Sequence, residues 1–222
     1  GTQFQNTSVL AYHYYAPPQL PPSTPLVARM QFAVQRAEAR RLGSAMMLTE
    51  TCGPACNDFS ITEFDGVADA ADAFRQSYAT WEWKTFCRED DHTVNSTSQW
   101  ANYGSCKTGY GSPWNGSLPA HAQRYARTYA RAVAGNVTRL DYDATSGDFM
   151  VSYNLDTRIP SPTEIFAHKE FHYGSGLSLS VTPEGVVDSK YNETTGLLHI
   201  MAKDNAQHGQ EVVVHIANAQ QQ

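Results

Sequence analysis

The chain lacks both a long apolar run and an excess of positive charge. No hydrophobic stretch in its 222 residues approaches the roughly 18 residues that a membrane-spanning helix requires. Its 22 acidic residues outnumber its 16 lysines and arginines, so the formal net charge is -6. This balance argues against a nucleic-acid partner, which favours a basic patch. Residues 1–4 have no charged or apolar leader pattern, so we expect any signal peptide to lie outside this sequence.

Cysteine is scarce, and the four present are Cys52, Cys56, Cys87 and Cys106. Zinc binding is one interpretation, but a C-x3-C pair followed by a widely spaced pair matches no common finger or ribbon. We therefore favour two local disulfides, Cys52–Cys56 and Cys87–Cys106, among the three connectivities that four cysteines allow. The histidines show no metal spacing, so we expect neither a metal ion nor a cofactor.

Asparagine is also infrequent, but its placement is unusual. Five of the ten asparagines begin an N-x-[ST] sequon without proline: Asn6, Asn95, Asn115, Asn136 and Asn192. The frequency of serine and threonine alone would give roughly one or two such matches. Together with paired cysteines, the sequons predict a glycoprotein of the secretory pathway, either secreted or lysosomal.

Strand and helix patterns alternate through the first part of the chain. Apolar or aromatic strands are predicted over 9–15, 45–48 and 78–83, and helices over 25–42, 65–75 and 119–134. Such alternation predicts parallel strands with helical crossovers. Three parallel strands leave unpaired edges, so we expect the missing strands to come from an N-terminal chain of the same precursor. A small self-contained α/β domain is the alternative.

The pattern changes after Gly135, where the hydrophobic period falls from 3.6 residues to 2. Turn residues separate short alternating segments, namely 138–142, 148–153, 177–181, 197–201 and 212–216. Regular short strands of this kind predict an antiparallel β-sandwich. The expected domains are therefore 1–135, an α/β domain, and 136–222, a β-sandwich.

One carboxylate lies where a catalytic group is expected. The apolar run Met46-Met47-Leu48 ends in Thr49-Glu50, and catalytic groups in βα-barrels lie at the carboxyl ends of strands. A strand that simply ends in a solvated glutamate is the plain alternative. The neighbouring predicted strands carry Tyr12-His13-Tyr14-Tyr15 upstream and Ser77-x3-Trp81-x-Trp83-Lys84 downstream.

These motifs, with Leu48-Thr49-Glu50, Arg124-Tyr125-Ala126 and Pro162-Thr163-Glu164-Ile165, resemble glycoside hydrolase family 5 and its endoglycoceramidase branch. The resemblance implies strands six to eight of a (β/α)8 TIM barrel, followed by an antiparallel β-sandwich. It also implies a retaining β-glycosidase with Glu50 as nucleophile. The family's acid/base motif, usually Asn-Glu at the end of the fourth barrel strand, has no match in the α/β part of the chain. Because retention needs two carboxyl groups about 5–5.5 Å apart, the N-terminal chain is expected to supply the second.

The resemblance assigns roles to further residues. Tyr15 would hydrogen-bond the nucleophile, and His13, on the same strand face, would contact the sugar or the acid/base. Trp81 would stack under the sugar, whereas Lys84 would reach the glycan. Trp83 and Phe86 would line an apolar groove for ceramide. For the histidine and the tryptophans, ordinary core packing is the alternative.

The expected function is hydrolysis of glycosphingolipids by an endoglycoceramidase or glucosylceramidase type of enzyme, with transient contact at a membrane surface. Two alternatives remain. One is a non-catalytic carbohydrate-binding or structural glycoprotein that keeps the scaffold, and the other is a family-5 glycanase acting on soluble β-glycans.

Overall fold

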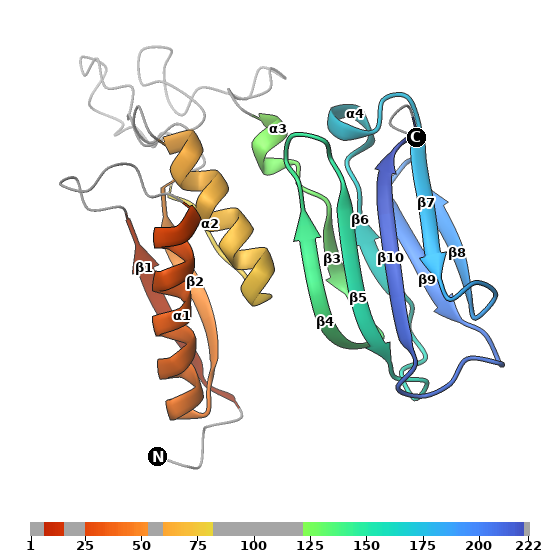
Figure 1. Cartoon of the computed structure of the whole chain (residues 1–222), viewed down its shortest axis with the longest axis horizontal. Coiled ribbons are helices and arrows are strands. Elements are labelled where there is room, and N and C mark those ends of the chain that lie inside the picture. The colour runs from red at the N-terminus through yellow and green to blue at the C-terminus, as the bar shows by residue number, and fades with distance from the viewer. Residues whose placement is uncertain (1–6, 16–24, 53–59, 82–121, 220–222) are drawn as a thin grey trace, which may run out of the picture. The chain divides into compact units, whose positions relative to one another are not determined.

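The computed structural model describes residues 7–15, 25–52, 60–81 and 122–219 and contains two compact units, Gly1–Ala122 and Gln123–Gln222 (Figure 1). Residues 88–118, whose many serines, asparagines and glycines predict a long polar loop, lie outside the described residues. Among the described helices, none combines the length and the hydropathy needed to cross a bilayer.

The first unit is a parallel βα arrangement centred on one strand. Its elements are β1 (Val9–Tyr14), α1 (Pro25–Leu42), β2 (Ala45–Thr51) and α2 (Ser60–Phe74). Strands β1 and β2 pair in parallel. On the other side of β2, residues 77–81 continue the parallel pattern through bridges at Leu48–Tyr78 and Cys52–Trp81. The predicted third strand is thus present only as isolated bridges at Tyr78 and Trp81 within the described residues, and β2 is bonded on both sides.

Helix α1 has the predicted bounds but buries a different face from the one its apolar period suggests. Leu26, Met30 and Val34 are 66%, 62% and 61% exposed, and Ala33 and Ala37 are exposed as well. These five residues are called the α1 stripe below. The helix ends in two capping bonds typical of a C-terminal glycine motif, Gly43 N–H to the Arg40 carbonyl and Ser44 N–H to the Ala39 carbonyl, with Gly43 at φ 65°.

The buried face of α1 is built from one aromatic ring and small residues. Phe32 is fully buried beside Ala28, and its ring meets Tyr12 edge-on at 6.1 Å between centroids. Small residues at this face allow the helix backbone to approach the sheet closely, so the larger apolar side chains of the α1 stripe are left outside. Phe74 of α2 joins the same cluster, with its ring centroid 5.8 Å from Phe32.

The predicted start of the second helix at Asp65 is wrong, because α2 already begins at Ser60. The sequence Ser60-Ile61-Thr62-Glu63 has the S-x-x-E pattern typical of helix starts. Asp65 therefore lies one turn inside the helix rather than at its cap.

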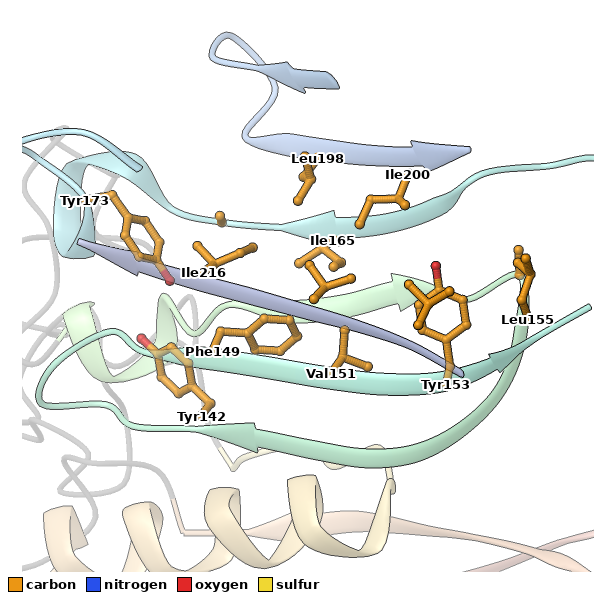
Figure 2. Packing of buried hydrophobic residues seen from close by; sticks show 14 residues of the cluster. Tyr142, Phe149, Val151, Tyr153, Leu155, Ile165, Tyr173, Leu198, Ile200 and Ile216 are labelled. Atoms are coloured by element: carbon orange, nitrogen blue, oxygen red, sulfur yellow. The ribbon is translucent and has the colours of Figure 1, made fainter. Parts of the chain in front are cut away.

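The second unit is an antiparallel β-sandwich, as predicted. After α3 (Ala122–Tyr125), its strands are β3 (Tyr129–Ala132), β4 (Gly135–Tyr142), β5 (Phe149–Leu155), β6 (Thr163–Phe166), β7 (Leu177–Thr182), β8 (Val187–Asn192), β9 (Leu197–Ala202) and β10 (Glu211–Asn218), with a short α4 (Lys169–His172). One sheet has the order β4-β5-β10-β7 and the other β3-β6-β9-β8. Side chains of both sheets interdigitate between them (Figure 2), including Phe149, Val151, Ile165, Leu198 and Ile216.

The predicted helix over 119–134 is wrong in its second half. The described helix ends at Tyr125, and residues 129–132 form β3, which pairs with β6. Alanines and arginines favour a helix locally, but pairing with a buried strand outweighs this weak preference. The division between the units consequently falls between Ala122 and Gln123 rather than after Gly135.

A buried tyrosine ties three segments of the sandwich together. The Tyr173 hydroxyl donates to the Gly147 carbonyl at 2.6 Å and accepts from Thr128 Oγ1 at 2.6 Å. Burial raises the pKa of Tyr173 to about 12. The phenol therefore stays protonated at physiological pH and links the β4–β5 turn to the start of β3.

Candidate active site

The predicted catalytic residues meet at the carboxyl ends of the parallel strands. Glu50 is the penultimate residue of β2, Tyr15 directly follows β1, and Trp81 lies at the end of the parallel segment beside β2. This is the edge at which βα-barrels hold their active sites.

A bulge determines which way Glu50 faces. Tyr12 pairs with Leu48, but the next pair is His13 with Glu50, so Thr49 is an extra residue in β2. The Thr49 hydroxyl donates to the Tyr12 carbonyl at 3.1 Å within this bulge. Regular alternation would place Glu50 on the same face as Leu48, which packs against the helices. The extra residue reverses the alternation and brings Glu50 to the face of His13.

Two groups converge on one oxygen of the carboxylate. The Tyr15 hydroxyl donates to Glu50 Oε1 at 2.7 Å, and His13 Nδ1 lies 3.7 Å from the same oxygen. The Glu50 side chain is 31% exposed and that of His13 is more open, at 59%. Within the described residues Oε2 has no such contact, so a reacting group can approach it.

The phenol of Tyr15 is held in its protonated form. Burial, the hydrogen bond to Glu50 and the negative charges of Glu50 and Glu63 all raise the pKa of Tyr15. The side chain consequently acts as a hydrogen-bond donor at physiological pH. The donor on Oε1 also fixes the orientation of the Glu50 carboxylate.

Glu63 was not among the residues predicted from the sequence. It lies in the first turn of α2, is almost fully buried and acts electrostatically on Tyr15. The sequence contains a signal for a helix start at Ser60-x-x-Glu63, but nothing that indicates proximity to Tyr15.

The remaining predicted positions are described only in part. Trp81 is 49% exposed, which leaves ring surface available for a ligand. Cys52 is buried and disulfide-bonded, in agreement with an oxidised cysteine at this position. Several predicted residues lie outside the described ranges, namely Trp83, Lys84, Phe86, Cys56, Cys87, Cys106, Asn6, Asn95 and Asn115.

A carboxylate with a fixed donor on one oxygen can serve as a nucleophile toward an electrophilic carbon, and an exposed indole beside it can support a sugar ring. In the part of the chain that the structure covers, no three His, Cys, Asp or Glu side chains converge to hold a metal ion.

The chain is similar to known proteins along most of its length. The glycoside hydrolase family 5 C-terminal domain matches residues 127–216. The endoglycoceramidases of Cyanea nozakii and Hydra vulgaris are 29% and 28% identical to 87% of this chain. The chain spans about a third of the length of these curated relatives, 35% and 33% respectively.

Solved structures show the same fold at lower sequence identity. Endo-glycoceramidase II from Rhodococcus sp. matches with a TM-score of 0.63 and 17% identity, over 94% of this chain and 43% of that one. Sterylglucosidase 1 of Cryptococcus neoformans matches with a TM-score of 0.63 and 13% identity, over 88% of this chain and 32% of that one. The predicted fold, a C-terminal part of a TIM barrel followed by a β-sandwich, is thereby confirmed. The resemblance is confirmed as well: the chain is endoglycoceramidase-like, and its residues 127–216 match the C-terminal domain of glycoside hydrolase family 5.

Proposed function

We propose that this chain supplies the nucleophile of a retaining β-glycosidase that acts on glycosphingolipids. The observation that carries the proposal is Glu50, held by the Tyr15 hydroxyl at 2.7 Å at the carboxyl ends of the parallel strands. The printed names of the curated relatives, both endoglycoceramidases, support a glycolipid substrate. Glycolipid chains are embedded in membranes, so the enzyme would meet its substrate at a membrane surface.

The proposed reaction has two displacements. Glu50 Oε2 attacks the anomeric carbon and forms a glycosyl ester, while an acid protonates the departing ceramide oxygen. The same second group then removes a proton from water, which attacks the anomeric carbon and releases Glu50. Tyr15 donates to Oε1 and keeps the carboxylate oriented, and Trp81 supports the sugar ring.

We propose that an N-terminal part of the same protein supplies the acid/base. The one Asn-Glu pair in the sequence, Asn192-Glu193, lies at the end of β8 in the β-sandwich and not after a parallel strand of the first unit. Two features support a further βα unit beside this one: the exposed α1 stripe and the side of β1 facing away from β2, where β1 has no strand neighbour among the described residues. An apolar helix face and an open strand edge are both surfaces that proteins normally cover.

The test is Glu50→Gln in the full-length enzyme, because an amide cannot attack while its size is nearly unchanged. We expect kcat to fall by several orders of magnitude with substrate binding retained. Glu38→Gln is the matched control, since Glu38 forms an exposed ion pair with Arg41 on α1 and should leave kcat unchanged.

A mechanism-based label makes the assignment direct. A 2-deoxy-2-fluoro glycoside with a good leaving group should trap the glycosyl ester on the peptide that contains Glu50. A label on another carboxylate, or normal turnover by Glu50→Gln, would refute the role of Glu50.

A further inference from the structure

We propose that Asn136 and Asn192 carry N-linked glycans, and that these glycans shield the two lateral sides of the β-sandwich from association with other strands. The proposal concerns the second unit alone and does not depend on the catalytic role of Glu50. It assumes passage through the secretory pathway, which the five sequons and the disulfide-bonded Cys52 support.

The sandwich has two lateral sides, each made by one edge strand from each sheet. Strands β4 and β7 form the edges of one sheet, and β3 and β8 form the edges of the other. Residues 133–134 join β3 directly to β4, and residues 183–186 join β7 to β8. One side of the sandwich is therefore β3 with β4, and the opposite side is β7 with β8 (Figure 1).

Each lateral side carries one sequon. Asn136 is the second residue of β4, and Asn192 is the last residue of β8. An edge strand presents unpaired N–H and C=O groups, which makes it a template for pairing with another chain. On the first side, β4 has eight residues and β3 only four, so the sequon lies on the strand with the longer open edge.

Both asparagines are accessible to a glycan. Each is exposed, as are the sequon threonines Thr138 and Thr194. The Asn192 Oδ1 accepts the backbone N–H groups of Thr194 at 3.0 Å and Thr195 at 3.2 Å. The turn is thus held by the carboxamide oxygen. The Nδ2 atom, which would carry the sugar, makes neither of these two hydrogen bonds.

The modification joins the asparagine Nδ2 to the anomeric carbon of a lipid-linked oligosaccharyl diphosphate. The new N–C bond forms as the C–O bond to the diphosphate breaks, and Nδ2 loses one proton. This transfer precedes folding in the secretory pathway. The exposure of both asparagines matters because the folded sandwich must then accommodate a glycan at each position.

Asn192 also ends a row of apolar side chains. Across neighbouring strands, Asn192 pairs with Leu197 and Leu197 pairs with Phe166. Phe166 pairs with Tyr129 on the next strand. The rings of Tyr129 and Phe166 lie 5.5 Å apart, and Tyr129 is about half exposed. A glycan at Asn192 would lie beside this row as well as beside the edge of β8, and would hinder contact of the row with another molecule.

The experiment uses the full-length protein secreted from a eukaryotic host. Peptide-N-glycosidase converts each glycosylated asparagine to aspartate, and peptide mass spectrometry should detect this conversion at Asn136 and Asn192. Thr138→Val and Thr194→Val abolish the two sequons without changing either asparagine. Thr138→Ser and Thr194→Ser are the matched controls, because serine preserves the sequon.

We expect each valine variant to lose one glycan and the double valine variant to self-associate at concentrations where the serine controls stay monomeric, measured by sedimentation velocity. Trimming the native protein with an endoglycosidase that leaves one sugar provides the same comparison if the variants are not secreted. The proposal would be overturned if Asn136 and Asn192 were both unmodified. It would also be overturned if the double valine variant and the trimmed protein both stayed monomeric. The same sequon variants can be made in the Glu50→Gln enzyme, so that the result on glycosylation and self-association does not depend on whether Glu50 is the nucleophile.

Discussion

Replacing Tyr15 with phenylalanine removes one hydroxyl from the candidate site and leaves the ring in place. That hydroxyl donates to Glu50 Oε1 at 2.7 Å, and the phenol is protonated because burial and the nearby carboxylates raise its pKa. The change therefore tests whether a fixed donor on Oε1 contributes to the reactivity of the carboxylate. No other described hydrogen bond of Tyr15 is removed.

The expected magnitude follows from the type of bond and from its exposure. A hydrogen bond to a charged group contributes about 1.5–3 kcal/mol. Glu50 is 31% exposed, so water can replace the lost donor in part, and the lower half of that range is expected. At about 1.36 kcal/mol per decade, a loss of about 1.5–2 kcal/mol corresponds to a fall of roughly 10- to 30-fold in kcat/KM.

The assay is steady-state hydrolysis of a soluble fluorogenic aryl β-glycoside by the full-length enzyme. Tyr12→Phe is the matched control on the same strand. Its hydroxyl accepts from Gln76 Nε2 at 2.7 Å, and its ring packs against Phe32 on the helix side. Tyr12→Phe should lower the free energy of unfolding by about 1 kcal/mol and leave kcat/KM near the wild-type value.

Two results would refute the reasoning. If Tyr15→Phe retained full kcat/KM, the hydroxyl would have no part in catalysis. If Tyr12→Phe and Tyr15→Phe lost activity equally and in proportion to a lowered Tm, the effect of Tyr15 would be one of folding rather than of the carboxylate's environment.

Three further predictions concern the indole, a close backbone approach and a buried phenol. Trp81→Ala should lower kcat/KM by roughly 10²–10³, about 3–4 kcal/mol, with little change in Tm because the ring is 49% exposed; equal losses of activity and stability would indicate core packing instead. Gly135→Ala should reduce the free energy of unfolding by about 1–3 kcal/mol, because a Cβ there would lie 2.2 Å from the Asn154 carbonyl oxygen. Gly174→Ala is the control, because no atom lies within 4 Å of a Cβ added there. Urea unfolding should show that Gly174→Ala changes the free energy of unfolding by less than about 0.5 kcal/mol. The pKa of Tyr173 is raised from 10.0 to about 12, so the folded state keeps a proton that the unfolded state loses, and stability should fall as pH rises through this window; Tyr173→Phe should flatten that slope in urea titrations.

The sequence predicted the elements whose local and tertiary preferences agree. The apolar run before Glu50 forms β2, the aromatic run before Tyr15 forms β1, and both strands are parallel as the alternation with helices indicated. The resemblance implied that Glu50, His13 and Tyr15 act together, which agrees with the shared carboxyl edge of parallel strands.

Other features depend on pairing that no local pattern encodes. The residues of β3, Tyr129–Ala132, have the composition of a helix and become a strand only because β6 lies beside them. Strand β6 has only four residues, and β8 is a polar edge strand, so neither was predicted. Position along the chain likewise gave no indication that Glu63 affects Tyr15.

The bulge at Thr49 makes the candidate site depend on how β1 and β2 pair and not only on which residues they contain. If Thr49 paired regularly with His13, Glu50 would lie on the face of Leu48 and turn toward the helices, even though every predicted catalytic side chain remained present. Substitution scans would miss this dependence, because Thr49 contributes its backbone as a spacer and only one hydroxyl bond, to the Tyr12 carbonyl. Relatives compared by residue identity alone can therefore appear to retain the carboxylate while regular pairing of the two strands turns it away from the residues that contact it here.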